Sequence, residues 1–125
     1  MNKLTCFYCS HEDNFLPNDI LCPACGQPLL FDSAQFNNAR ILIEEKIALK
    51  KFQNFLPLEK VEPDLSLKEG STPLLRLSRL EKSLNQSGLT AKLEAANPTL
   101  SFKDRGTAVV IQKLAEMKVE KIGTV

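Results

Sequence analysis

The chain has 125 residues, of which 43% are hydrophobic and 25% charged, and this composition is typical of a soluble globular protein. Its formal charge is +1, and no sustained basic run argues for nucleic acid or an anionic membrane as a partner. The N-terminus lacks the apolar core of a signal peptide, and no stretch approaches the ~20 apolar residues of a membrane helix. We therefore expect a cytoplasmic protein.

Residues 1–31 contain all four cysteines, arranged as two close pairs. Cys6 and Cys9 form one C-x2-C motif, and Cys22 and Cys25 form the second, twelve residues further on. Two such turns bring four thiolates to one tetrahedral zinc ion. Because four sulfur ligands leave no position for water, we expect this zinc to be structural. The sequence therefore predicts a zinc-ribbon module with these four cysteines as the metal ligands.

The alternative reading is that the cysteines are incidental. A module of this size has too small a core to fold without a metal or a crosslink, which favours the metal. His11 is a further candidate ligand. With four thiolates available, we interpret it as an exposed loop residue.

Next, residues 33–52 contain neither proline nor glycine and carry apolar side chains at roughly helical spacing, so a helix is predicted there. Residues 53–73 contain three prolines and are predicted to form an extended connector across a surface. Ser78 followed by Glu81 resembles a capping box. It predicts a helix over 79–87.

Strands and a helix are predicted to alternate in residues 89–125. Residues 89–96 show the period-2 pattern of a strand. Residues 104–118 are predicted as a helix, and 119–125 as a second strand. The expected apolar face of that helix consists of Ala108, Ile111, Leu114 and Ala115. This order suggests a parallel α/β sheet that ends on its last strand, so we expect an incomplete domain.

Two segments resemble a known enzyme family. Residues 97–106 read N-P-T-L-S-F-K-D-R-G, which agrees at nine of ten positions with the lysine segment of fold-type II pyridoxal-phosphate enzymes, N-P-T-G-S-F-K-D-R-G. Residues 66–74 read S-L-K-E-G-S-T-P-L and are similar to the S-L-G-E-G-x-T-P-L segment of threonine synthases. Residues 55–57, F-L-P, match the residues that precede it. Many threonine synthases also begin with a two-knuckle ribbon.

The resemblance implies roles for five residues. Lys103 would be the lysine that condenses with the cofactor aldehyde, held in a cleft where desolvation lowers its pKa. Ser101 and Phe102 would shape the cofactor pocket, although Phe102 could equally be a packing residue. Thr72 and Ser71 would line the substrate side.

Four further positions of these segments have expected structural roles. Asp104 and Arg105 are expected to serve helix capping and local pairing. Leu100 and Lys68 stand where the family has glycine, and we expect Leu100 to remove the left-handed backbone option and alter the loop.

By resemblance, the fold is α/β: an N-terminal zinc ribbon followed by the start of a fold-type II, tryptophan synthase β-like, parallel α/β domain. The expected division is a ribbon at 1–31, a helix and extended connector at 32–73, and the incomplete pyridoxal-phosphate domain at 74–125.

The implied parent reaction is the lyase conversion of O-phosphohomoserine and water to threonine and phosphate. It would use pyridoxal phosphate, a structural zinc and an amino-acid phosphate substrate, in a protein that is commonly a homodimer. We find no glycine-rich phosphate cradle, so we expect a fragment that is inactive alone. The alternatives are another fold-type II enzyme, such as a cysteate synthase or threonine dehydratase, and a non-catalytic zinc-ribbon binding module.

Overall fold

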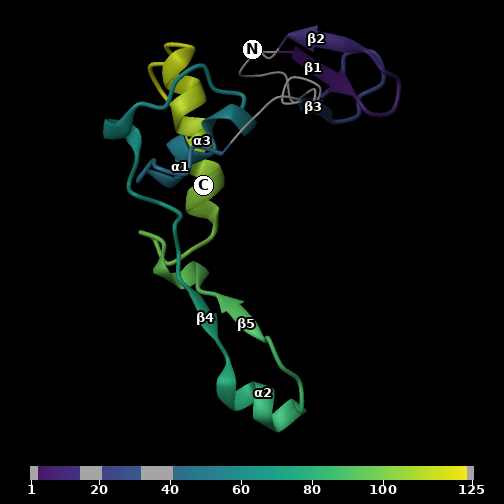
Figure 1. The fold of residues 1–125 in the computed structure, drawn as a ribbon. Helices are drawn as coiled ribbons and strands as arrows, with labels where there is room; N and C mark the ends of the chain where they lie inside the picture. Colours follow the sequence, from purple (N-terminus) through teal and green to yellow (C-terminus); the bar gives the residue numbers. More distant parts are fainter. Residues whose placement is uncertain (1–2, 15–20, 32–40, 124–125) are drawn as a thin grey trace.

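The computed structural model describes residues 3–14, 21–31 and 41–123 of the chain. These residues form both helices and strands, in the order β1, β2, β3, α1, β4, α2, β5, α3 (Figure 1). Within these ranges, no helix has the length and apolar character that a membrane crossing requires.

The cysteine-rich part forms a three-stranded antiparallel sheet. The central strand is β1 (Lys3–Cys6), which pairs with β2 (Glu12–Asn14) on one side and β3 (Leu29–Phe31) on the other. In β1 the side chains of Leu4 and Cys6 are only 3% and 1% exposed. This alternation is that of a strand with one covered face.

A small apolar core lies between α3 (Lys103–Glu116), α1 (Ala48–Lys51) and the connector that follows α1. Its buried members are Leu49, Leu58, Val61 and Ala108, with Ile47, Leu56 and Val109 packed against them. Because these residues are far apart in the sequence, the core exists only when the connector crosses α3.

The connector is extended, as predicted, apart from short 3-10 turns at Gln53–Phe55 and Pro63–Leu65. The α3 side chain of Gln112 holds its backbone: the amide oxygen accepts from the Glu62 N–H, and the amide nitrogen donates to the Glu62 carbonyl, both at 2.8 Å. One carboxylate oxygen of Glu116 accepts from the backbone N–H of Glu59 at 2.7 Å. Backbone groups that have no strand partner are thereby satisfied.

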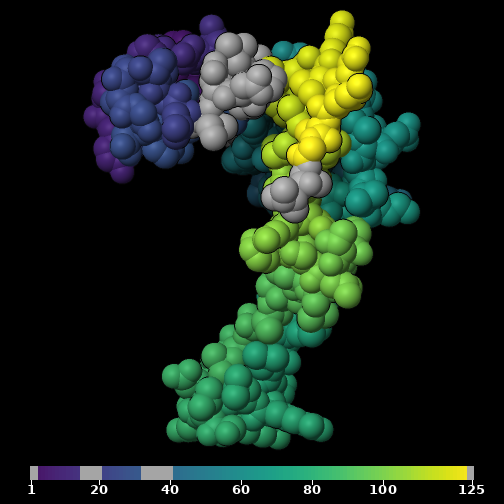
Figure 2. Space-filling model, turned by 180° about the vertical axis from the view of Figure 1, so that it is seen from behind, coloured from purple at the N-terminus to yellow at the C-terminus, as the bar shows by residue number. Residues whose placement is uncertain are grey.

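An arm extends away from α1 and α3. It consists of β4 (Leu74–Arg76), α2 (Ser78–Leu84) and β5 (Thr90–Lys92), with β4 and β5 paired antiparallel. Figures 1 and 2 show this teal and green arm standing clear of the two helices. All three residues of β4 are exposed.

The helix predicted over 33–52 is wrong where it can be compared with the structure. Residues 32–40 lie outside the described residues, residues 41–47 form turns and bends, and only Ala48–Lys51 are helical. The side chains of Ile41 and Ile43 are 48% and 81% exposed. An apolar stripe without a surface to pack against does not hold a helix.

The helix predicted over 79–87 is confirmed as α2, but its capping box is not formed. Ser78 is the first helical residue and makes no capping hydrogen bond. The Glu81 carboxylate instead accepts from the backbone N–H groups of Gly88 and Leu89, at 2.8 and 3.0 Å. The helix ends at Asn85, whose φ of 50° is left-handed.

The predicted strand over 89–96 is too long, since β5 ends at Lys92 and Glu94–Ala96 form a 3-10 turn. The predicted parallel sheet is also wrong for the described residues. Residues 119–123 form no strand, and the partner of β5 is the antiparallel strand β4.

The helix predicted over 104–118 is confirmed as α3, within two residues at its end. The N–H groups of Lys118 and Val119 donate to the carbonyls of Ala115 and Leu114, both at 3.0 Å. This is the Schellman pattern, with Lys118 left-handed at φ 56°. The Val119 N–H is thus used to end the helix.

Candidate functional site

Two tight turns carry the four cysteines. In the first, the Ser10 N–H donates to the Cys6 carbonyl at 2.9 Å, and in the second the Gly26 N–H donates to the Cys22 carbonyl at 2.8 Å. Ser10 and Gly26 both have a positive φ, of 58° and 71°. The two turns therefore have the same form.

The four sulfur atoms converge on one point. All lie within 4.8 Å of one another, with Cys6 and Cys25 at 3.5 Å and Cys9 and Cys22 at 3.6 Å. A tetrahedral zinc with Zn–S bonds of ~2.3 Å separates its sulfur ligands by ~3.8 Å. The donor set and its spacing thus fit one tetrahedral metal ion.

The thiols of this cluster titrate unequally. The hydrogen bond from the Cys9 backbone N–H is the main reason why the pKa of Cys6 is lowered to about 6. The Gln27 backbone N–H favours the Cys25 thiolate, but desolvation and the neighbouring thiols outweigh it and raise the pKa of Cys25 to about 12. Four thiolates so close together need a cation to offset their charge.

His11 does not join the described cluster. Its Nε2 lies 3.7 Å from the Oδ2 of Asp13, and the metal-type group consists of the four cysteines alone among the residues that the structure describes. This placement agrees with its interpretation as a loop residue.

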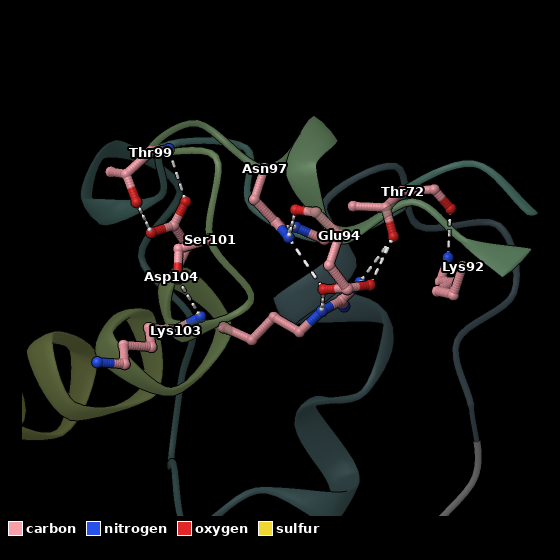
Figure 3. Close-up of polar contacts among 10 residues, drawn as sticks. Thr72, Lys92, Glu94, Asn97, Thr99, Ser101, Lys103 and Asp104 are labelled. Atoms are coloured by element: carbon pink, nitrogen blue, oxygen red, sulfur yellow. Dashed lines mark hydrogen bonds and ion pairs between the residues drawn. The ribbon is translucent and has the colours of Figure 1, made fainter.

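The segment with the predicted cofactor lysine begins with a turn. The Leu100 N–H donates to the Asn97 carbonyl at 2.9 Å. The Asp104 carboxylate then accepts from the Thr99 N–H at 2.8 Å and from the Thr99 hydroxyl (Figure 3). Asp104 lies in the first turn of α3, where the helix dipole favours a carboxylate. The loop is thereby held onto the start of the helix.

Lys103 is the first residue of α3, and its side chain is exposed rather than enclosed in a cleft. Figure 3 shows it pointing away from Glu94 and Thr72. Its backbone N–H donates to the Ser101 hydroxyl at 3.2 Å. In the part of the chain that the structure describes, no hydrogen bond or ion pair engages its amine. An accessible amine of this kind fits a lysine that condenses with an aldehyde.

The predicted pocket residues lie beside it. Ser101 is half-buried, and Phe102 is 65% exposed. An open cavity of about 280 Å³ lies along the first half of α3, and its lining includes Leu67, Thr99 and Asp104 but not Lys103, Ser101 or Phe102.

A polar network joins the other predicted residues to α3. The Arg105 Nε and Nη2 donate to the two carboxylate oxygens of Glu94 at 2.8 and 2.9 Å. The Nη2 also donates to the Thr72 hydroxyl at 3.0 Å, and that hydroxyl donates to Glu94 at 2.8 Å. Local pairing of Arg105 was predicted, but its partners were not.

The hydrogen bonds from Arg105 are the largest cause of the lowered pKa of Glu94. Together with the bonds from Thr72 and Asn97, they lower the pKa of Glu94 to about 2. Hydrogen bonding to the same carboxylate raises the pKa of Arg105. The pair is therefore fully charged at neutral pH.

The two predicted substrate-side residues differ in placement. Thr72 is 5% exposed, and its carbonyl accepts a hydrogen bond from the Lys92 ammonium (Figure 3). Ser71 is exposed and has a left-handed φ of 48°. The structure brings Thr72 together with Glu94, while Ser71 faces solvent.

Sequence reasoning missed Glu94, Lys92 and the contact of Asn97. Asn97 is 2% exposed; its side-chain oxygen accepts from the Gly70 N–H, and its nitrogen donates to the Glu94 carboxylate, at 2.9 and 3.0 Å. The available signal was a pair of charges at the end of a predicted strand, directly before the lysine motif.

Leu100 and Lys68, which replace glycines of the family motifs, have unusual backbone conformations. Leu100 and Lys68 have φ values of 61° and 64°, so both adopt the left-handed conformation that glycine favours. The expectation that Leu100 removes this backbone option is wrong. Leu100 adopts this conformation at the steric cost of its Cβ atom.

Comparison with known proteins supports the motif assignment. Residues 65–125 match the model of the pyridoxal-phosphate dependent enzyme family. The chain is 42% identical over 82 residues to the threonine synthase of Methanocaldococcus jannaschii, and 45% identical over 74 residues to that of a Bacillus species; the alignments cover 66% and 59% of this chain. The threonine synthase of Methanosarcina acetivorans is 32% identical over 126 residues, covering 98% of the chain.

The chain spans only 20%, 21% and 30% of the lengths of these three relatives. No solved structure matches it significantly. The family model covers the segment that contains Lys103, and the alignment with the Methanosarcina acetivorans relative extends over nearly the whole chain, including the part with the four clustered cysteines. The predicted resemblance of this chain to threonine synthase-like, pyridoxal-phosphate-dependent enzymes is therefore confirmed.

Proposed function

We propose that Lys103 is the lysine that binds pyridoxal phosphate, in a threonine synthase-like enzyme of fold-type II of which these residues form the N-terminal part. The observation that carries the proposal is the accessible Lys103 amine at the start of α3, within a segment that matches the family model. Its side-chain amine would hold the cofactor through its aldehyde group. The cofactor, when bound, supplies an electron sink for substrate carbanions.

The other residues have supporting roles in this proposal. Cys6, Cys9, Cys22 and Cys25 hold a structural zinc, as the convergence of their sulfur atoms supports. Ser101 and Phe102 flank the cofactor. Lys103 would also move protons at the substrate carbons. The substrate is an amino-acid phosphate, O-phosphohomoserine, which is converted with water to threonine and phosphate.

Cofactor attachment is tested by incubating the chain with pyridoxal phosphate, reducing with borohydride and locating the modified lysine by peptide mass spectrometry. We expect one modification for each chain, at Lys103. Lys103→Arg should abolish it because a guanidinium does not condense, and Lys82→Ala, which removes an exposed lysine of α2, should leave it unchanged. Modification spread over many lysines, with no preference for Lys103, would overturn the assignment.

Substrate choice is a separate test. The test compares O-phosphohomoserine with threonine and with other amino acids. The measured quantity is the protection of Lys103 from borohydride trapping by each compound. Preferential protection by O-phosphohomoserine supports threonine synthase, and preferential protection by threonine supports the dehydratase. We expect the 125 residues alone to form no threonine, because the sequence holds no glycine-rich loop to bind the cofactor phosphate.

The non-catalytic binding module finds less support. Phe7 and Tyr8 are exposed and stack edge to face, as a binding surface could require. However, Lys3 is paired with Glu12 at 2.6 Å, and Asp13 adds a second acid beside it. The described ribbon face is therefore not the basic surface that nucleic acid needs.

A further inference from the structure

Arg105 connects three parts of the chain close to the start of α3. It lies two residues after Lys103, on the first turn of α3. Its guanidinium reaches Glu94, in the turn after β5, and Thr72, in the segment before β4. Figure 3 shows Thr72, Glu94 and Asn97 gathered on one side of the start of α3. The start of the helix is thereby tied to both segments.

Two hydrogen bonds fix the orientation of the Arg105 guanidinium relative to the Glu94 carboxylate as well as the distance between them. Arg105 Nε and Nη2 take one oxygen each of the Glu94 carboxylate, at 2.8 and 2.9 Å. Such a two-point pair depends on the planar guanidinium, and a lysine in its place can only act as a point charge. The orientation of the first helical turn is thus coupled to the Glu94 side chain.

The backbone of Gly70 completes the arrangement. A Cβ atom at Gly70 would lie 2.7 Å from the Cβ of Ala48 and 3.1 Å from Nη1 of Arg105. The Gly70 N–H donates to Asn97 at 2.9 Å. The segment that contains Glu69, Gly70 and Thr72 therefore packs directly on the arginine.

Thr72 has no hydroxyl hydrogen left for a substrate. Its single hydroxyl hydrogen is donated to Glu94 at 2.8 Å, and its oxygen accepts from Arg105 at 3.0 Å. The residue is also 5% exposed. A hydroxyl that is buried and engaged in both directions acts on its neighbours rather than on a ligand.

We propose that Arg105, Glu94 and Thr72 are positioning residues, which hold the Lys103 end of α3 against the 69–73 segment. This inference rests on the proposed role of Lys103. It assigns Thr72 to the support of the lysine, in place of the substrate contact that the family resemblance implies.

The test compares two arginine–glutamate pairs of the same chain. Arg105→Lys keeps the charge and loses the two-point pair, and Arg76→Lys does the same to the pair of Arg76 with Glu81 in the arm, at 3.1 and 3.2 Å. The dissociation constant of pyridoxal phosphate is measured by the yield of modified Lys103 after borohydride reduction. All variants are assayed below their melting temperatures.

We expect Arg105→Lys to weaken pyridoxal phosphate binding about tenfold, as expected for loss of one charged hydrogen bond, and Arg76→Lys to leave it unchanged. Thr72→Val should weaken binding similarly, and Thr72→Ser should restore it. A substrate contact at Thr72 would leave cofactor binding unaffected by Thr72→Val.

Three results would overturn the inference. Wild-type affinity in Arg105→Lys is the first, and wild-type affinity in Thr72→Val is the second. The third is modification spread over many lysines of the wild-type chain with no preference for Lys103, which refutes the proposed function and the inference that rests on it. The first two leave the proposed function intact, so the two failures are distinguishable.

Discussion

Leu100 and Lys68 show how single residues carry the strain of the candidate site. Both are left-handed, with φ values of 61° and 64°, where a side chain crowds the backbone at a cost of ~1–2 kcal/mol. Leu100 gains little in return, because its side chain is 75% exposed. Its position three residues before Lys103 places this strain in the loop that leads to the lysine.

Leu100→Gly should therefore stabilise the protein. Relief of the left-handed strain exceeds the extra unfolded-state entropy of glycine, for a net gain of about 0.5–1 kcal/mol. Thermal unfolding followed by circular dichroism measures the change. Leu100→Ala is the matched control, since it removes the side chain and keeps the strain. Equal stabilisation by both variants would show that the exposed side chain, and not the backbone, is responsible.

Glu94 makes stability depend on pH. Its pKa in the folded state, about 2, lies below the ordinary value of 4.5. Its contribution is therefore fully present above about pH 4.5 and is lost as the pH falls from there towards 2. Melting temperatures of the wild type and Glu94→Gln, measured from pH 7 to pH 2, should converge over this window. A constant difference between the two proteins would contradict the lowered pKa.

At the scale of elements, α3 buries polar side chains where an apolar face was predicted. Its buried residues are Ala108, Gln112 and Lys113, whereas Ala115 is exposed. Gln112 is 1% exposed and meets both backbone groups of Glu62. The helix faces a connector without regular structure, and such a backbone needs polar partners.

Gln112→Ala should destabilise the contact of α3 with the connector. It leaves the Glu62 N–H and carbonyl without their partner and opens a cavity, at a cost of about 2–3 kcal/mol. Chemical denaturation followed by circular dichroism provides the measurement. Gln86→Ala, at an exposed position after α2, is the control and should change stability little. A loss below about 0.5 kcal/mol for Gln112→Ala would mean that water replaces the amide.

At the scale of the molecule, the described residues contain two parts that are stabilised differently. In the cysteine-rich part, the buried side chains are Leu4, Cys6 and Cys22, so two of the three are predicted metal ligands. The part around α3 has a small core centred on Leu49, Leu58, Val61 and Ala108. We expect the first part to depend on a bound metal ion, and the second on contacts between α3 and the connector.

Removal of zinc should unfold the cysteine-rich part alone. Structural zinc sites supply ~10–16 kcal/mol of apparent binding free energy, which the three short strands cannot replace. Amide hydrogen exchange of the full chain, before and after chelation, should show lost protection in β1, β2 and β3 and retained protection in α3. Cys9→Ser should behave like the chelated protein. Protection of β1 that survives in metal-free protein would contradict this dependence.

The site was predicted in part from particular residues. The C-x2-C spacing predicted a metal cluster because short turns place such sulfur atoms locally, and the four cysteines do converge. The motif around Lys103 predicted the family. Glu94 could not be paired with Arg105 from the sequence, because the two residues are eleven positions apart and a 3-10 turn and a loop separate them. Their contact depends on how that loop folds back.

The sequence by itself determined the features that depend on local geometry: the cysteine turns, α2, α3 and the lysine motif at the start of a helix. Tertiary structure decided the others. Residues 41–47 are not helical, and the side chains of Ile41, Leu42 and Ile43 are exposed. β5 pairs with β4 rather than with a parallel partner. The hydrogen bonds of the Thr72 hydroxyl also depend on tertiary structure, since its partners Glu94 and Arg105 are 22 and 33 positions away in the sequence. Long-range contacts of this kind leave no periodic signal along the chain.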